Sequence, residues 1–450
     1  MATTATQFHD LTACEAAAKI RSGEISPVEL IRALLERIDR YDARVKAWEA
    51  VDADGALAAA QDCERRRAEA GDRPLFGVPF AAKDIFYSKG LRTAAGFKPW
   101  DSFAPDYDAN SVARLRAAGG ILLGKTTTTQ FANQDPSKTR NPWNEDRSPA
   151  GSSSGSGAAV AARMVPLALG TQTGGSIQRP AAFNGCIGLK ATYGRISRHG
   201  VIPLSWSLDH PGPLVRSVED AALALQICSG HDPNDPGSAR APVPDFVGAL
   251  QGDIVPPRFG LVRDLVDDAQ PEVRDHVLAV ARRLERAGAE IHEVSYPGGM
   301  PLILAVHSLI GNVEGASVHL SLWSRKREHY GPRFRAHVEI GQLIPSAAYV
   351  QAQRLRRQLR GQMDELLQSV DCLIAPTAST VAVDPSTTGS PAFQSPNSLF
   401  GLPAISLPTG LSAERLPFST QLVTRRLDEV TLFRAARWCE QTLDPMPAPF

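Results

Sequence analysis

Short apolar stretches alternate with helical segments along most of this chain, and that alternation limits its fold more than any other feature. The stretch 257–296 is the clearest case, because a strand pattern, a helical repeat and a second strand pattern follow one another there. Similar buried-strand patterns occur at 77–84, 121–124 and 372–376. Helices that alternate with buried strands pack on the faces of a sheet. The sequence therefore predicts an α/β sandwich with a mostly parallel or mixed sheet.

Several segments carry helix signals of their own. Residues 26–29 have the pattern of a capping box with proline at the first helical position, and apolar residues of 30–38 repeat at helical spacing. Helical patterns also run over 56–71, 109–118, 157–163 and 347–369. Ser154 and Ser156 are expected to cap a helix that begins near Ala158.

The overall charge and composition favour a protein that handles small molecules. Lys and Arg together number 48, as do Asp and Glu, so the formal net charge is zero. A neutral chain has no overall field to attract nucleic acid or an anionic membrane. The six cysteines lack CxxC spacing, the first residues lack a signal-peptide pattern, and no uncharged apolar run approaches the ~20 residues of a membrane span. We expect a cytoplasmic monomer or homodimer with no metal, no other cofactor, and neither nucleic acid nor membrane as partner.

One short motif suggests nucleotide binding. Residues 119–126 match the phosphate-loop pattern GxxxxGK[ST] letter for letter. Such a loop needs a strand before the first glycine and a helix after the Lys-Thr pair. Here a helical pattern precedes Gly119, and the loop positions hold Ile, Leu and Leu, which favour burial. The motif is therefore interpreted as a chance match.

A second short motif suggests a different serine hydrolase. Residues 151–155 match GxSxG, the nucleophile elbow, with Ser153 at its centre. An elbow should follow an apolar strand, whereas a polar loop bounded by prolines precedes this one. His199 or His210 would have to serve as the base. This arrangement stays open as a second enzymatic possibility.

Two Gly/Ser-rich loops and one strand lysine form the strongest chemical pattern of the chain. The loops hold Ser152 and Ser176, and the segment 170–176 offers unhindered backbone N–H groups beside the second serine. Such a segment suits a nucleophile with its own oxyanion hole. Lys83 could act as the base only if it is uncharged, and burial would lower its pKa. The alternative for Lys83 is an ion pair with Asp84.

In these segments the chain resembles the amidase signature hydrolases. The matching stretches follow the family's order over about residues 10–440, at 77–84, 124–126, 139–144, 151–162, 170–190, 204–218 and 397–410. The resemblance implies one α/β/α sandwich domain over 1–450, built on a large mixed sheet. Within it we expect N-terminal helices at about 10–70, a catalytic core at about 75–220 and a variable substrate-facing region at about 295–400.

The resemblance also implies roles for individual residues. Ser176 matches the family nucleophile, Ser152 the bridging serine that follows a cis peptide bond, and Lys83 the base. The backbone donors of the oxyanion hole match Thr173, Gly174, Gly175 and Ser176. In this scheme Lys83 deprotonates Ser152, Ser152 activates Ser176, and water hydrolyses the acyl-enzyme.

The chain departs from the family pattern beside the nucleophile. Gln172 and Gln178 stand where many members have Asp and Arg, and the arginine falls one place later, as Arg179. Gln172 and Arg179 are therefore candidates for substrate binding. Two roles are open for Arg179: contact with a substrate carboxylate, or hydrogen bonds to backbone carbonyls.

Together these features predict a serine hydrolase that cleaves amides, anilides or carbamates (urethanes), with esterase side activity. The alternative is a glutaminase-type A subunit of a tRNA-dependent amidotransferase, which releases ammonia for a partner. The amides at 172 and 178 favour the first function. Residues 198–206, 309–322 and 393–400 are expected to select the substrate.

Overall fold

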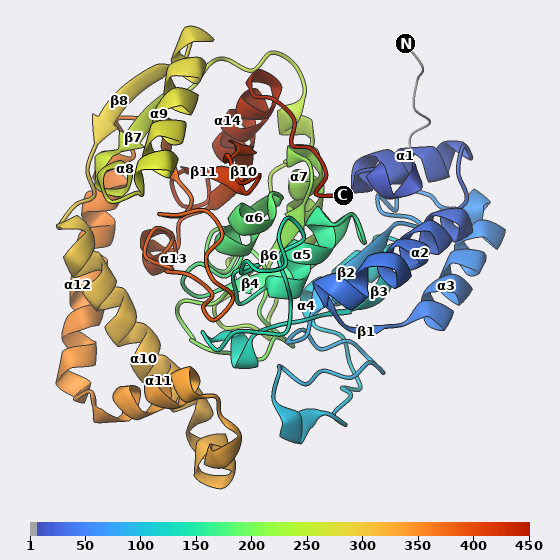
Figure 1. The fold of residues 1–450 in the computed structure, drawn as a ribbon, viewed down its shortest axis with the longest axis horizontal. Helices are drawn as coiled ribbons and strands as arrows, with labels where there is room; N and C mark the ends of the chain where they lie inside the picture. The colour runs from blue at the N-terminus through green and yellow to red at the C-terminus, as the bar shows by residue number, and fades with distance from the viewer. Residues whose placement is uncertain (1–6) are drawn as a thin grey trace.

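The computed structural model describes residues 7–450, and one sheet of 11 strands runs through it (Figure 1). The strands lie in the order β1-β3-β2-β4-β6-β5-β10-β11-β9-β7-β8. Their bounds are β1 Trp48–Val51, β2 Pro79–Lys83, β3 Ile121–Thr126, β4 Leu167–Gln172, β5 Ile187–Lys190, β6 His210–Val215, β7 Arg258–Val262, β8 Glu290–Val294, β9 Cys372–Pro376, β10 Ala404–Leu411 and β11 Pro417–Val423. Parallel pairs occur around β2 and β7, and the remaining pairs are antiparallel. The fold is thus an α/β fold with a mixed sheet, as predicted.

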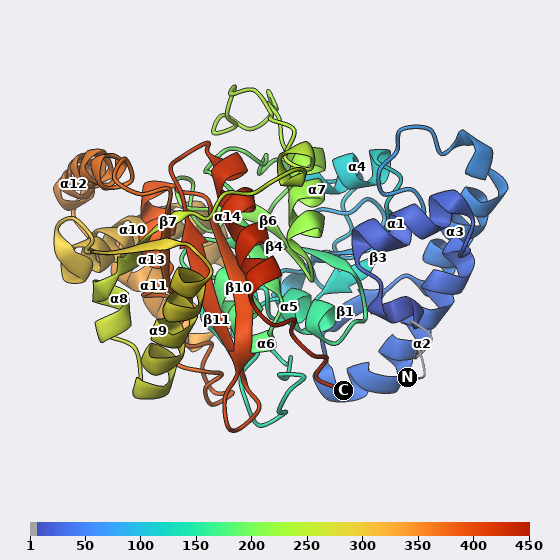
Figure 2. The same ribbon diagram turned by 90° about the horizontal axis from the view of Figure 1, so that it is seen from above.

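Helices cover the sheet on both sides. They are α1 Ala13–Ser22, α2 Pro27–Val45, α3 Ala53–Arg65, α4 Asn110–Ala117, α5 Ser154–Ala161, α6 Gln178–Asn184, α7 Val218–Cys228, α8 Arg263–Asp267, α9 Pro271–Arg286, α10 Gly299–Lys326, α11 Pro332–Leu343, α12 Ser346–Leu366, α13 Ser395–Phe400 and α14 Glu429–Thr442. In Figure 2, α4 and α7 lie above the central strands and α5 and α6 below them. Contacts agree, since α4 packs on α7 and α5 packs on α6. Most apolar side chains of these layers belong to one continuous core.

Strand β2 determines where chemistry can occur. It lies between β3 and β4 and runs parallel to both. The carboxyl ends of parallel neighbours meet at one edge of a sheet. Lys83, at the end of β2, therefore lies near the segment that follows Gln172 at the end of β4.

Local signals account for where α2 begins. The Ser26 hydroxyl accepts a hydrogen bond from Val28 N at 3.0 Å, and Glu29 accepts one from Ser26 N at 3.0 Å. The predicted capping box is thus formed at the start of α2.

The prediction for the start of α5 was wrong. The helix begins at Ser154 rather than near Ala158, and no side chain caps it. Ser154 Oγ lies 2.7 Å from Ser137 Oγ, while Ser156 Oγ donates to Leu169 O at 2.9 Å. Every residue of α5 is buried, so the two hydroxyls need hydrogen-bond partners inside the protein. They find these partners on neighbouring segments.

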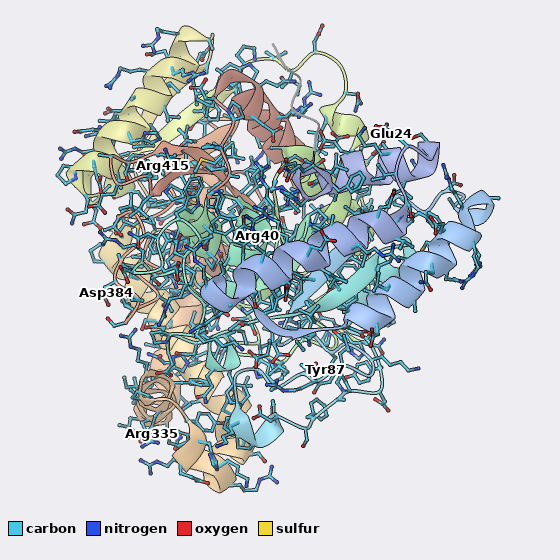
Figure 3. The ribbon with its side chains drawn as sticks, turned by 45° about the vertical axis from the view of Figure 1, so that its right-hand side comes forward. Glu24, Arg40, Tyr87, Arg335, Asp384 and Arg415 are labelled. Atoms are coloured by element: carbon cyan, nitrogen blue, oxygen red, sulfur yellow. The ribbon has the colours of Figure 1, made fainter. Side chains whose placement is uncertain are left out.

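Helices α10, α11 and α12 form one end of the molecule, opposite α1–α3 (Figure 1). Figure 3 places Arg335 of α11 at this end and Glu24, just after α1, at the other. The stretch Gly299–His329 has the length and hydropathy of a membrane span, although a core helix can pass the same test. Its buried Glu314 accepts hydrogen bonds from Ser205 Oγ at 2.5 Å and Ser207 N at 2.8 Å, which favours a helix of the protein body.

Candidate active site

Lys83 is the last residue of β2 and is fully buried. Its Nζ donates to Ser152 Oγ at 2.7 Å and to Thr171 Oγ1 at 2.9 Å. Burial lowers the pKa of Lys83 well below its ordinary value, while the negative charge of Asp209 raises it. An amine that is neutral in the folded protein can accept a proton from Ser152.

The alternative ion pair of Lys83 is not formed. Asp84 instead faces Lys125, with 3.4 Å between Oδ1 and Nζ. Lys125 Nζ also donates to Phe86 O at 2.6 Å and to Thr93 Oγ1 at 2.7 Å. The phosphate-loop match at 119–126 therefore ends in the buried strand β3, and its lysine holds internal contacts rather than facing an open loop.

Ser152 lies in the turn that leads into α5. The Gly151–Ser152 peptide bond is cis, as the family resemblance implied. A Cβ on Gly151 would lie 2.8 Å from Thr388 Cγ2 and 2.9 Å from Thr129 Cγ2, so only glycine fits there. This close packing holds the Ser152 hydroxyl, fully buried, against Lys83.

Ser176 lies beyond the end of β4 and is 8% exposed. It lines a cavity of about 300 Å³, here named cavity A. Over residues 7–450, the contacts of the Ser152 hydroxyl include Lys83 but not the Ser176 hydroxyl. The hydrogen bond between Lys83 and Ser152 is therefore formed, whereas the hydrogen bond between the hydroxyls of Ser152 and Ser176 is not formed in the described residues. Catalytic hydrogen bonds are often long in an unliganded site and tighten when substrate binds.

The segment 173–176 has the free donors that an oxyanion hole requires. Among the described residues, no acceptor receives a hydrogen bond from the backbone N–H groups of Thr173, Gly174, Gly175 and Ser176. Thr173 is held from both sides: its Oγ1 donates to Asp209 at 2.5 Å, and His307 Nε2 lies 3.0 Å from its carbonyl oxygen. Thr173, the first of these donors, is therefore held in place before substrate arrives.

Gln172 belongs to a buried network of amides. Its Oε1 accepts hydrogen bonds from Ile177 N and Gln178 N, both at 3.0 Å, and its Nε2 donates to Gln178 Oε1 at 2.9 Å. Gln178 Nε2 then donates to Gln421 Oε1 at 3.0 Å. The amide pair that replaces the family's usual charges thus holds the start of α6. Gln172 lines neither of the two cavities beside the site, and substrate contact by Gln172 stays a prediction.

Arg179 is 3% exposed and lines cavity A. Its Nη2 donates to Gly151 O at 2.9 Å, so one of the two expected roles, a bond to a backbone carbonyl, is present. Its Nε and Nη1 are buried and have no partner among residues 7–450. Burial lowers the pKa of Arg179 to about 10, which leaves the guanidinium charged at neutral pH.

Cavity A is nearly free of charge. Its wall combines the segment 173–176, one face of α10 and the segment 390–395. His307 and His337 line it, and burial lowers both pKa values, that of His337 to about 4, so both are neutral at pH 7. No Asp or Glu among the described residues lines cavity A, and Arg179 is its only charged side chain.

A larger cavity of about 550 Å³, cavity B, adjoins cavity A. The two share Ala132, Thr173 and Leu204 in their walls. The loop 198–206, expected to select substrate, lines cavity B. The other two expected stretches contribute little. Only Gly311, Asn312 and Ser395 of them line cavity A, because the residues of α10 that line it run from Leu304 to Asn312 and end near the start of the expected stretch.

Three residues of the site escaped the sequence analysis: Thr171, Asp209 and His307. Each acts through a partner distant in sequence, as Thr171 does with Lys83, 88 positions away. Thr171 lies within β4 and Asp209 directly before β6, so no local sequence pattern brings them together with Lys83 and Thr173.

The elbow arrangement around Ser153 finds no base. Ser153 Oγ donates to Thr171 O and accepts from Thr171 N, both at 3.2 Å, so the hydroxyl is held by β4. His210 Nδ1 lies 2.5 Å from Leu208 O, and His199, which lines cavity B, stacks on Tyr107. Within the described residues neither histidine bonds to Ser153.

A buried lysine and serine, a glycine-rich donor segment and a cavity on an α/β scaffold define an enzyme of the hydrolase class. Comparison with known proteins gives the family. The family model described as Amidase matches residues 29–433. The chain therefore belongs to the amidase signature family and is an amidohydrolase by class.

Individual relatives span nearly the whole chain. The A subunit of the glutamyl-tRNA(Gln) amidotransferase from Roseiflexus sp. (strain RS-1) is 39% identical over 95% of this chain and 96% of its own. The chain is also similar in structure to a protein from a vestigial complex that reveals the evolutionary origins of an s-triazine catabolic enzyme. The TM-score is 0.91 and the identity 32%, with 97% of this chain and 100% of that chain covered. The peptide amidase of Stenotrophomonas maltophilia has a TM-score of 0.87 and 29% identity, with 98% of each chain covered.

Proposed function

We propose that this protein hydrolyses the C–N bond of neutral amides, anilides or carbamates through an acyl-enzyme on Ser176, with esters as side substrates. One observation carries the proposal. A buried lysine of lowered pKa is bonded to Ser152 beside four unpaired N–H donors at the wall of cavity A. The small-molecule substrate would bind without a cofactor, in the cytoplasm as the sequence predicts.

The chemistry follows from these contacts. Neutral Lys83 accepts the proton of Ser152 while Ser152 accepts the proton of Ser176, whose Oγ forms a bond to the substrate carbonyl carbon. The resulting oxyanion is stabilised by the N–H groups of 173–176. When the C–N bond breaks, Ser152 gives a proton to the leaving nitrogen, and Lys83 returns its proton to Ser152. Water then attacks the acyl carbon by the same route and releases Ser176.

Cavity A supports a neutral acyl group. A charged group that leaves water must find a partner, or it costs several kcal/mol. A substrate ammonium would meet no Asp or Glu in the described wall of cavity A. A carboxylate would meet Arg179, whose Nη2 is bonded to Gly151 O and whose Nε and Nη1 have no partner among residues 7–450, but the ammonium of an amino acid would stay unpaired. Uncharged acyl groups therefore match this wall better than amino acids.

A second candidate function has a specific observation in its favour. Curated relatives at 37% to 39% identity are A subunits of the glutamyl-tRNA amidotransferase. In that case the chain would release ammonia from an amide for a partner protein. The lack of Asp and Glu in the described wall of cavity A is the observation that favours the stand-alone hydrolase, because the ammonium of glutamine would find no partner there.

A screen of the purified protein on matched chromogenic substrates tests the main proposal. The substrates share one uncharged acyl group and differ in the bond: anilide, carbamate or ester. Turnover of the anilide that Ser176→Ala abolishes is the expected result. Turnover that persists in Ser176→Ala, or an enzyme that cleaves the ester alone, would contradict it.

A further inference from the structure

We propose that cavity B is the leaving-group site and that it selects amines with an aromatic or apolar body. This inference rests on the proposed function, since it assigns the second half of the substrate to a place in the structure. Cavity B has a volume of about 550 Å³, larger than cavity A, and the two meet at Thr173.

The proton relay is the path from Ser176 through Ser152 to Lys83. The position of cavity B relative to this relay indicates which side of the scissile C–N bond the cavity holds. Thr171 and Thr173 both line it, and Thr171 Oγ1 accepts a hydrogen bond from Lys83. Ile85, two residues after Lys83, lines the same cavity. The relay through Lys83 must protonate the leaving nitrogen, so the amine lies on the relay side of the scissile bond. The segment 174–176, which includes Ser176, lines cavity A and not cavity B. This arrangement assigns the acyl group to cavity A.

The wall of cavity B is mainly apolar. Its apolar lining includes Ile85, Val201, Ile202, Pro203, Leu204 and Pro211. Trp206 also lines it and is 55% exposed, an unusual setting for an indole. The carbonyl oxygen of Trp206 accepts hydrogen bonds from Tyr193 Oη, at 2.6 Å, and from Arg198 Nη1, so the backbone at this position is fixed. An indole carried on this fixed backbone beside an apolar cavity suits an aromatic ring by stacking.

The charged side chains that line cavity B already form ion pairs with one another or hydrogen bonds within the protein. Asp209 accepts from Thr173 Oγ1, Leu204 N and Ser205 N at 2.5, 2.8 and 2.9 Å. Arg198 and Asp235 form an ion pair at 2.6 Å. Because their hydrogen-bonding capacity is largely used, these groups add little attraction for a charged amine. The leaving group favoured by this wall is an arylamine or apolar alkylamine.

The test compares two substrates with the same acyl group, butyryl-p-nitroanilide and butyramide. Trp206→Ala should lower kcat/KM for the anilide by roughly tenfold and leave the butyramide value unchanged, since ammonia does not reach Trp206. Trp206→Phe should keep most of the anilide rate. Phe103→Ala, an exposed aromatic residue that lines neither cavity, is the matched control. Trp206 is exposed enough that its removal should not unfold the chain.

A second readout uses the reverse reaction. An activated butyryl ester forms the acyl-enzyme, and added aniline competes with water for the acyl carbon: its nitrogen bonds to that carbon, the bond to Ser176 Oγ breaks, and the relay takes the aniline proton. Trp206→Ala should reduce the fraction of butyranilide product roughly tenfold. An equal effect on anilide and butyramide, no effect on either, or a wild type that cleaves butyramide but not the anilide would overturn the leaving-group site. Turnover that survives Ser176→Ala would instead overturn the proposed function.

Discussion

At the scale of single residues, Ser176 gives the most direct test. Its hydroxyl makes no side-chain hydrogen bond within residues 7–450 and lines cavity A, so Ser176→Ala removes a reacting group and little packing. We expect turnover to fall at least about a thousandfold, with an unchanged unfolding midpoint. Steady-state kinetics and denaturant unfolding measure the two effects. Ser153→Ala is the control for the elbow motif: if it abolished activity while Ser176→Ala did not, the nucleophile would be Ser153.

Lys83 predicts the pH dependence. The amine must be neutral in the free enzyme, and burial lowers its pKa well below the ordinary value. Activity should therefore rise with pH through the pKa of Lys83 and reach a plateau well below the range in which an exposed lysine loses its proton. Lys83→Ala should lose most amide activity but less activity on activated esters, whose leaving groups need no proton. A pH profile of kcat/KM on both substrates measures this, and an unchanged amide profile in Lys83→Ala would exclude the relay.

Arg179 decides between neutral and acidic substrates. Its Nη2 donates a hydrogen bond to Gly151 O, next to Ser152, so the side chain stabilises the turn that carries Ser152. We expect Arg179→Ala to lower kcat/KM by the same factor for a neutral amide and for its carboxylate-bearing analogue. Arg179→Lys, which keeps the charge but loses the planar fork, serves as the comparison. A strong preference for the carboxylate in the wild type that disappears in Arg179→Ala would make this an enzyme for acidic amides.

At the scale of elements, the start of α6 depends on one amide. Gln172 Oε1 accepts from both Ile177 N and Gln178 N. Gln172→Leu would leave these buried donors unpaired, at a cost of about 1–3 kcal/mol each. Urea unfolding should show the loss, whereas Gln358→Leu, an exposed glutamine on α12, should change stability little. A stability equal to wild type in Gln172→Leu would show that water or another group replaces the amide.

The elements also show how far sequence reasoning reaches. Strand β9 was predicted at its observed bounds and β2 within two residues at each end, because short apolar runs end at polar or proline residues. The start of α5 was misplaced, since Ser154 and Ser156 bond to other segments instead of capping their own helix. The contacts of Thr171, Asp209 and His307 could not be predicted, because each is made by tertiary packing of distant segments.

At the scale of the whole molecule, the question is whether the chain works alone. Both halves of the chain contribute strands to one sheet, and both cavities are lined by this chain. Relatives over nearly its full length include one component of an amidotransferase and a peptide amidase, so family membership is compatible with either way of working. The lack of acidic side chains in the described wall of cavity A is the feature from which we predict that the chain works alone.

Three five-carbon amides that differ in their charged groups test this prediction on the purified chain. Glutamine has an ammonium and a carboxylate, glutaramate has the carboxylate alone, and pentanamide has neither. The ammonium of glutamine would leave water and meet no acidic side chain in the described wall of cavity A, a cost of several kcal/mol. We therefore expect kcat/KM for glutamine to be at least roughly a hundredfold below that for pentanamide, with glutaramate between them or equal to pentanamide. Ammonia release, measured with no other protein present, gives all three values. A preference for glutamine, or turnover that requires an added partner protein, would identify the chain as the ammonia-supplying component of a larger enzyme instead.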